Sequence, residues 1–252
     1  MIKLYRNAFL VFVSMTLFAC SSYKKGIYFK DLNREIPSKE SISNFSPITI
    51  QPQDILNISV SSLNPESSAL FNFASTLSPN IQMTEASIGY MVDEHGDVHL
   101  PVLGSVHVGN LTSSQAREQI QLKLTPYLKE PVVIVKLVNF KVSIMGDVAR
   151  PGQYQVPSER VTIPEAISLA GDLNATALRN LLIIREVNGE REFINVDLTK
   201  KSMFNSPYYY LKNNDVIYVQ AGRIKYNAID PVYQRVSLLV SVLSVAAIFI
   251  FK

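Results

Sequence analysis

The residues best suited to hold a metal ion lie together in one short segment of the chain. His95 and His99 alternate with Asp93 and Asp97, and imidazole and carboxylate groups are common metal ligands. Their spacing fits no strong metal-binding pattern, and acidic residues around Gly96 are typical of a tight turn. We therefore expect a turn between two strands here, with no metal ion and no cofactor.

Three acidic residues raise the question of an enzyme. Glu159, Glu165 and Asp172 are candidates for the two carboxylates that glycoside hydrolysis needs across a cleft. Glu165 stands three residues after Thr162, the spacing of a helix capping box, and Asp172 directly follows Gly171, which is expected to end that helix. No Ser–His or Cys–His nucleophile motif is present. We expect no catalytic residues.

The single cysteine has the clearest chemical interpretation. Lys3 and Arg6 precede an apolar run of about 11 residues, a length typical of a secretory signal and too short to span a bilayer. Leu17-Phe18-Ala19-Cys20 then resembles a bacterial lipobox, although Phe18 is bulkier than usual. The resemblance implies a signal peptide over 1–19, a lipidated Cys20, and sorting to the outer membrane. The alternative is a plain signal peptide with an incidental cysteine.

Charge and cysteine content narrow the function classes. The chain of 252 residues has a formal net charge of +3, and removing residues 1–19 takes away Lys3 and Arg6, which leaves +1. A nearly neutral protein without a run of like charges has no electrostatic footprint for nucleic acid. An exported chain with one cysteine forms no intramolecular disulfide, so packed cores must stabilise it.

The C-terminus carries a second membrane signal. Asp230-Pro231 is typical of a helix start, with an N-cap residue followed by proline. Residues 236–251 contain no charge and correspond to roughly 24 Å of helix, while counting from Pro231 gives roughly 31 Å, against a hydrocarbon core of about 30 Å. We predict a C-terminal transmembrane helix within residues 223–252.

Polar residues follow one stripe along this predicted helix. Gln234, Ser237, Ser241 and Ser244 are spaced three, four and three apart. Small hydroxylated residues on such a stripe favour close helix packing or a wetted surface. We interpret the stripe as a face through which several copies associate or with which they line a pore. The alternative is a simple anchor whose serines bond their own backbone.

Regular patterning begins near residue 48, after a polar segment over 20–47 that we interpret as a lipidated tether. Thr112 and Gln115 have the spacing of a capping box. Apolar residues then recur at every fourth position and predict one buried helix face: Ala116, Ile120, Leu124 and Leu128. The β-branched run over 132–138 predicts a strand buried on both faces.

A second unit starts at residue 140. Pro151-Gly152 predicts a tight turn with a positive φ at Gly152, and Asn188-Gly189 predicts a hairpin. Residues 213–219 repeat a theme of residues 51–60, in which a turn and an aspartate precede an alternating strand. Strands combined with one helix in each unit indicate the α+β class.

These motifs resemble a known family of proteins. Residues 54–58, 96–104 and 109–112 resemble the polysaccharide export domain of outer-membrane capsule and exopolysaccharide exporters (the Wza type), and residues 146–154, 166–171 and 214–217 are similar to the SLBB domain, a β-grasp module for soluble ligands. The motif positions are Asp54, Gly96, Pro101, Gly104, Gly146, Pro151, Gly152, Gly171 and Asp215. Gln53 and Asn214 stand where the family usually has glycine before the aspartate.

The resemblance implies a specific organisation. It places the polysaccharide export domain at 48–139, one SLBB domain at 140–222 and the membrane helix at 223–252, with the body in the periplasm. It further implies a homo-oligomeric ring in the outer membrane that exports polysaccharide. The partner implied is an inner-membrane polysaccharide copolymerase, often with tyrosine-kinase activity.

A lipid-anchored adaptor that binds periplasmic glycan without transporting it is the alternative function. Tyr208-Tyr209-Tyr210 are candidates for stacking on sugar rings in such a protein. Tyrosines alternating along a strand that leads to Asp215 are the simpler explanation of the same residues. The adaptor predicts a monomer or dimer, whereas the exporter predicts a ring.

Overall fold

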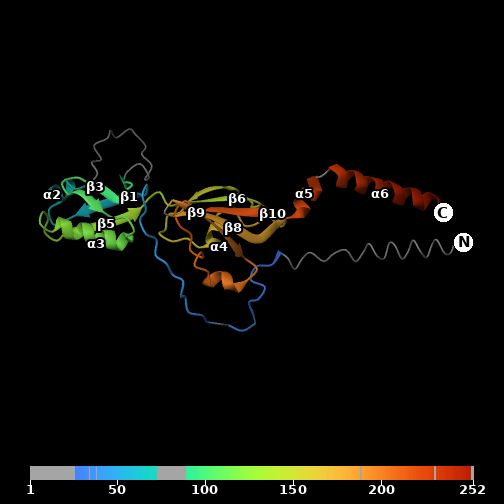
Figure 1. Cartoon of the computed structure of the whole chain (residues 1–252), viewed down its shortest axis with the longest axis horizontal. Coiled ribbons are helices and arrows are strands. Elements are labelled where there is room, and N and C mark those ends of the chain that lie inside the picture. The colour runs from blue at the N-terminus through green and yellow to red at the C-terminus, as the bar shows by residue number, and fades with distance from the viewer. Residues whose placement is uncertain are drawn as a thin grey trace.

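Two α+β units follow one another along the long axis of the molecule, and a helical C-terminal segment extends beyond the second unit (Figure 1). This computed structural model describes residues 26–33, 35–37, 39–72, 89–187, 189–229 and 231–250. Each unit has its own cluster of buried apolar side chains. The α+β class expected from the sequence is confirmed.

The first unit combines a small antiparallel sheet, a hairpin and two helices. The sheet has the strand order β2-β1-β5 and the hairpin pairs β3 with β4. In chain order, its elements are β1 (Ile55–Ser61), α2 (Pro65–Ala69), β2 (Tyr90–Met91), β3 (Asp97–Leu100), β4 (Gly104–His107), α3 (Ser113–Leu124) and β5 (Val132–Leu137).

The start of α3 confirms the capping box expected from the sequence. Thr112 Oγ1 accepts a hydrogen bond from the Gln115 backbone N–H at 3.2 Å, and Gln115 Oε1 accepts one from the Thr112 N–H at 2.9 Å. The predicted helix face is buried as well, since Ala116, Ile120 and Leu124 are fully enclosed. Local sequence therefore determines both where α3 begins and which side packs on the sheet.

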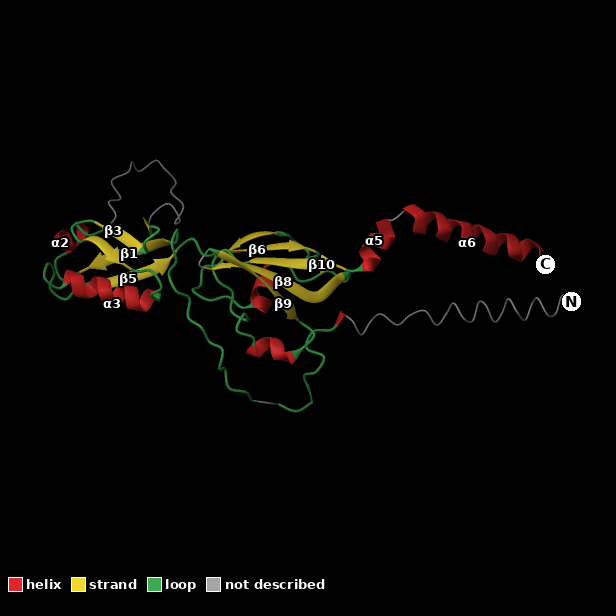
Figure 2. Cartoon of the chain, in the orientation of Figure 1, coloured by secondary structure: helices red, strands yellow, loops and turns green. Residues whose placement is uncertain are grey.

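The prediction that β5 is buried on both faces is wrong. Val133 and Val135 are buried, whereas Val132 is 56% exposed and Ile134 is 51% exposed. The sheet carries α3 on one side (Figure 2), and among the described residues no second layer covers the other. A β-branched run fits a one-sided strand as well as a fully buried one.

The second unit is a five-stranded mixed sheet with the order β7-β6-β10-β8-β9. Its first strand, β6, pairs in parallel with its last, β10, and the other pairings are antiparallel. In chain order, its elements are β6 (Lys141–Gly146), β7 (Gly152–Gln155), α4 (Ile163–Leu169), β8 (Ala177–Val187), β9 (Glu190–Asp197), the 3-10 helix η3 (Lys201–Asn205) and β10 (Val216–Ala221).

The left-handed glycine lies at the end of β6, which corrects the prediction for Gly152. Gly152 begins β7 and pairs with Ile144, so no turn conformation is needed there. Gly146 instead has a φ of 99°, and a Cβ at that position would lie 2.0 Å from the Val219 carbonyl oxygen. Close approach to β10 requires glycine at residue 146.

The segment interpreted as a tether lies along the second unit. The Phe29 N–H donates to the Leu198 carbonyl at 3.1 Å and the Lys30 N–H donates to the Thr199 carbonyl at 2.7 Å. Farther on, the Asn44 side-chain amide donates to the backbone carbonyl of Phe204 within η3 and to that of Ser206 directly after it. We call the described residues between 26 and 48 the strap, because they are fastened to this unit before the chain enters the first one (Figure 1).

The C-terminal segment is formed by α5 (Arg223–Ile229) and α6 (Pro231–Ile250). The helix start at Pro231 is confirmed. The predicted transmembrane helix is not found among the described residues, where no helix combines the length and apolarity needed to cross a membrane.

Candidate functional site

Two buried aspartates occupy equivalent turns, one in each unit. Asp54 precedes β1 and Asp215 precedes β10, and both are almost completely buried. Each carboxylate accepts a hydrogen bond from a backbone N–H three residues earlier, at 2.9 Å from Gln51 and at 2.8 Å from Lys212. The predicted repeat of a turn, an aspartate and a strand is therefore confirmed in three dimensions.

The residue before each aspartate has a left-handed conformation. Asn214 has a φ of 67° and Gln53 a φ of 71°. Asparagine adopts this region readily, as expected, whereas glutamine does so at a greater cost. The turn is thus retained at Gln53 without the glycine that the family usually has.

Asparagine side chains join the two units at their junction. Asn213 Nδ2 donates to Asp54 Oδ1 at 2.7 Å, while Asn213 Oδ1 accepts from the Lys141 N–H at 3.0 Å. Asn139 Oδ1 accepts from the Ile55 N–H at 2.9 Å. Burial raises the pKa of Asp54, and the hydrogen bonds from Gln51 and Asn213 oppose this effect without cancelling it.

A buried ion pair lies at the centre of the second unit. Arg185 on β8 binds Asp215 through both ends of its guanidinium, with Nε–Oδ1 at 2.9 Å and Nη2–Oδ2 at 2.6 Å. Nη2 also donates to the Tyr210 carbonyl at 3.2 Å, and the Tyr208 ring centroid lies 5.6 Å from the guanidinium carbon. The sequence reasoning missed Arg185; its signal is one arginine in the apolar run Leu181-Leu182-Ile183-Ile184 of β8.

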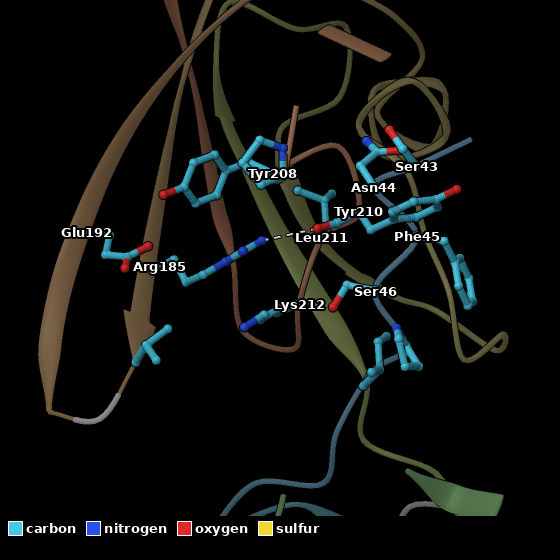
Figure 3. Close-up of a pocket in the computed structure, with 14 residues that line it drawn as sticks. Ser43, Asn44, Phe45, Ser46, Arg185, Glu192, Tyr208, Tyr210, Leu211 and Lys212 are labelled. Atoms are coloured by element: carbon cyan, nitrogen blue, oxygen red, sulfur yellow. Dashed lines mark hydrogen bonds between the residues drawn. The ribbon is translucent and has the colours of Figure 1, made fainter. Parts of the chain in front are cut away.

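A cavity of about 380 Å³ opens beside this ion pair. Figure 3 shows Tyr208, Arg185 and Glu192 on one side of it, with Asn44 and Phe45 of the strap on the other. Its lining combines an aromatic ring with hydroxyl, amide, carboxylate and ammonium groups. Such a lining suits a polar ligand that also has an apolar face.

A second cavity of about 780 Å³ lies at the junction of the two units. Its lining includes the turn around Asp54, the turn around Asn213 and the tip of the β8–β9 hairpin with Arg191. The two cavities have lining residues in common: Ile48, Val187 and Lys212. They are therefore neighbouring parts of one surface depression.

Aromatic rings fasten the strap to the second unit. Consecutive ring centroids lie 4.9 Å apart for Phe29–Phe204, 5.6 Å for Phe204–Tyr209, 5.0 Å for Tyr209–Tyr210 and 5.6 Å for Tyr210–Phe45. The predicted strand containing the three tyrosines is wrong, because they lie in the loop between η3 and β10. Ring contacts, rather than alternation along a strand, explain two of them: Tyr210 packs on Phe45 of the strap, and Tyr209 packs between Phe204 and Tyr210.

A further buried carboxylate holds the C-terminal helices. Asp147 accepts hydrogen bonds from Asn174 at 2.9 Å, Thr176 at 2.6 Å and Lys225 of α5 at 2.7 Å. Burial raises the pKa of Asp147, but the hydrogen bonds from Lys225, Thr176 and Asn174 outweigh it and hold the pKa below its usual value. Residue Asp147 thus links the sheet to α5.

The predicted polar stripe lies on α6. Ser237, Ser241 and Ser244 are exposed, while the side chain of Gln234 lies outside the described residues. Ser241 Oγ donates to the Leu238 carbonyl at 2.8 Å and Ser244 Oγ donates to the Val240 carbonyl at 2.7 Å. If the helix is a simple anchor, its serines are expected to bond their own backbone in this way. The role of the stripe in association between copies stays a prediction. The lipidation site Cys20 lies outside the described residues.

The remaining motif residues shape turns. Gly96 has a φ of 84°, and its carbonyl accepts hydrogen bonds from two successive backbone N–H groups. Pro101 lies in the turn between β3 and β4, and Gly104, with a φ of 72°, begins β4. Gly171 follows the end of α4, and Pro151 stands directly before β7. These motif residues shape the backbone, and none of them lines either of the two cavities.

The candidate enzyme and metal residues also have structural roles. The Asp93 carboxylate accepts from the backbone N–H groups of His95 and Asp97 at 2.9 Å each, which confirms the turn. Glu165 Oε2 accepts from the Thr162 N–H at 2.7 Å, as its capping role predicts. Asp172 accepts a hydrogen bond from the Tyr28 hydroxyl of the strap at 2.5 Å.

Comparison with known proteins identifies both units. Residues 43–138 match the family described as polysaccharide biosynthesis/export protein, and residues 140–219 match the SLBB domain. The chain is 26% identical over 152 residues to the EPS I polysaccharide export outer membrane protein EpsA of Ralstonia solanacearum. It is 25% identical over 135 residues to the protein of the same name from Ralstonia nicotianae.

These relatives are longer than the matched part of the chain. The alignments cover 59% and 52% of this chain, but only 38% and 35% of the two relatives. The two family matches, over residues 43–138 and 140–219, correspond to the two units of the structure.

Proposed function

Because this chain contains a polysaccharide biosynthesis/export domain followed by an SLBB domain, we propose that it is an outer-membrane component of a polysaccharide export apparatus. In this proposal several copies form a ring whose interior carries the polymer from the periplasm towards the cell surface. The chain supplies a passage and binding surfaces, and no chemical step. Cys20 would attach each copy to the membrane by its lipid.

The observation that carries the proposal is the order of the two domains together with their fixed junction. Asn139, in the connection between β5 and β6, accepts from the Ile55 N–H, and Asn213 donates to Asp54, so both fasten the export domain to the SLBB domain. Copies built in this way present the same extended shape to their neighbours. Identical subunits of fixed shape that join head to tail form a ring when the rotation between neighbours closes.

The helix α6 is the surface that we assign to association. Its apolar side chains are strongly exposed, with Val236 53%, Leu239 60% and Val245 54% accessible. Contiguous apolar exposure of this kind marks an interaction surface. The stripe of Ser237, Ser241 and Ser244 would allow neighbouring helices to approach closely. An inner-membrane polysaccharide copolymerase with tyrosine-kinase activity is the partner that we propose at the periplasmic side.

A gene deletion tests this function directly. Deleting the gene should abolish surface polysaccharide while polymer accumulates inside the cell envelope, and a plasmid copy should restore surface polymer. Undiminished surface polysaccharide in the deletion strain would contradict the proposal.

The adaptor is the second candidate, because Ser241 and Ser244 bond their own helix backbone. An adaptor needs no ring. If removal of residues 231–252 leaves export intact, the adaptor is favoured over the exporter.

A further inference from the structure

We propose that the two neighbouring cavities of the second unit form one groove that binds the exported glycan directly. We call it the hairpin groove, defined by the cavity at Tyr208 and the cavity at the junction, which meet at Lys212. This inference rests on the proposed export function and adds the residues that hold the substrate.

The aromatic end of the groove has a fixed ring. Tyr208 lines the cavity with its ring 5.6 Å from the Arg185 guanidinium. Arg185 is only 4% exposed and is bound on two atoms by Asp215, so the support beneath the ring is itself rigid. A rigid aromatic face packs well against the apolar C–H face of a sugar ring at little entropic cost.

The middle of the groove has an ammonium group. Lys212 lines both cavities and is exposed, although its backbone N–H is held by Asp215 at 2.8 Å. The backbone is therefore fixed, and the side chain is drawn among the lining residues of the cavity at Tyr208 (Figure 3). An ammonium with three donors suits ring hydroxyls and glycosidic oxygens.

The junction end offers donors and acceptors in balance. Its lining includes the Glu186–Arg191 ion pair, the Glu190 carboxylate and the side-chain amides of Gln53 and Asn214. Sugar hydroxyls both donate and accept hydrogen bonds, so they can use each of these groups. A polyphosphate or a nucleic acid would need an excess of positive charge in its binding site. The mixed charges of this lining therefore argue against both ligands.

A glycan chain is thus the ligand class that fits the whole groove. A lipid tail would leave the junction end with unpaired polar groups, and a small ion would make no use of the Tyr208 ring. A polymer of sugar rings meets one aromatic platform and then a series of hydroxyl partners.

Binding to the purified full chain tests the groove. The probe is a set of oligosaccharides cut from the surface polysaccharide of the producing strain, titrated by calorimetry into the detergent-extracted protein. Tyr208→Ala and Lys212→Gln should each weaken binding roughly ten-fold, whereas Tyr208→Phe keeps the ring and should bind as the parent does. Tyr226→Ala on α5 and Lys123→Gln on α3 are exposed controls outside the groove and should change nothing. No binding by the parent, or equal affinity in every variant, would overturn the groove.

Export in cells separates this inference from the function on which it rests. A strain carrying Tyr208→Ala with Lys212→Gln should assemble the protein normally and export little polymer. Normal export by this strain, when the gene deletion abolishes export, would refute the groove and leave the export function standing. Surface polysaccharide that persists in the deletion strain would refute the export function, while the calorimetric result would still decide whether the groove binds glycan.

Discussion

Asn213 Nδ2 donates a hydrogen bond of 2.7 Å to Asp54 Oδ1, although the two residues are 159 positions apart and belong to different domains. The carboxylate of one strand-starting turn is thereby bound to the neighbouring turn of the other domain. Asn213 also accepts from the backbone of Lys141, where the second domain begins. The two turns therefore act as the mechanical joint of the molecule.

Asn213→Ala tests that joint. The change removes two hydrogen bonds and leaves a buried oxygen of Asp54 without its donor, so we expect a loss of about 2 kcal/mol in unfolding free energy. Urea unfolding of the purified protein measures it. Gln121→Ala, at an exposed position of α3, is the matched amide control and should stay within about 0.5 kcal/mol of the parent. Equal stability of the two variants would show that the joint contributes nothing.

The β8–β9 hairpin offers a comparison of two arginines. Arg185 is buried against Asp215, whereas Arg191 pairs with Glu186 at the surface. Arg185→Met leaves an uncompensated buried carboxylate and should cost about 3–5 kcal/mol, while Arg191→Met should cost about 0–1 kcal/mol. Thermal unfolding of both variants provides the readout. The reverse order, or equal costs, would contradict the role given to the buried pair.

Two glycines with positive φ allow the cost of backbone strain to be distinguished from the cost of a steric clash. Gly146 lies against the Val219 carbonyl, while a Cβ at Gly189 would meet open space, and their φ angles are 99° and 80°. Gly189→Ala should cost only the conformational strain, about 1 kcal/mol, whereas Gly146→Ala should prevent the β6–β10 pairing and yield little folded protein. Circular dichroism and the soluble yield distinguish the two. A folded Gly146→Ala protein with parent-like stability would be inconsistent with this packing.

The link between Asp147 and Lys225 should depend on pH. The pKa of Asp147 in the folded protein is held below its usual value. The bond to Lys225 therefore contributes its full stability above the pKa of the unfolded state, about 3.9, and this stability is lost as the pH falls through the lower pKa of the folded state. Lys225→Gln should therefore be less stable than the parent at pH 7, by about 1 kcal/mol because Lys225 is partly exposed.

The free energy of unfolding of the parent and of Lys225→Gln would be measured from pH 7 down to pH 2. The difference between parent and Lys225→Gln should shrink towards the acid end of the range, where the carboxylate is protonated. A difference that is constant with pH would mean that Lys225 acts through packing alone.

Local signals in the sequence predicted a large part of the fold. The two capping boxes, Thr112 with Gln115 and Thr162 with Glu165, form as expected because each depends on four consecutive residues. The buried face of α3 follows from a helical period in the same way. The repeated turn before β1 and β10 was visible because its aspartates precede similar strand patterns.

Features that depend on distant partners could not be read from the sequence. The Arg185–Asp215 pair joins residues 30 positions apart, so the arginine beside an apolar run does not reveal which carboxylate it binds. The exposed side of β5 depends on whether a second layer exists, which a β-branched run does not reveal. The strap is polar and irregular, so its aromatic contacts with Phe204 and Tyr210 were hidden in a composition typical of a linker.

Native mass tests the central proposal, that several copies of this chain assemble into an export passage. The full protein would be extracted in mild detergent, and its mass measured by light scattering, with electron micrographs of the same fraction. We expect a closed ring of several copies, and removal of residues 231–252 should reduce it to single chains. A monomer that persists across several mild detergents would contradict the export ring.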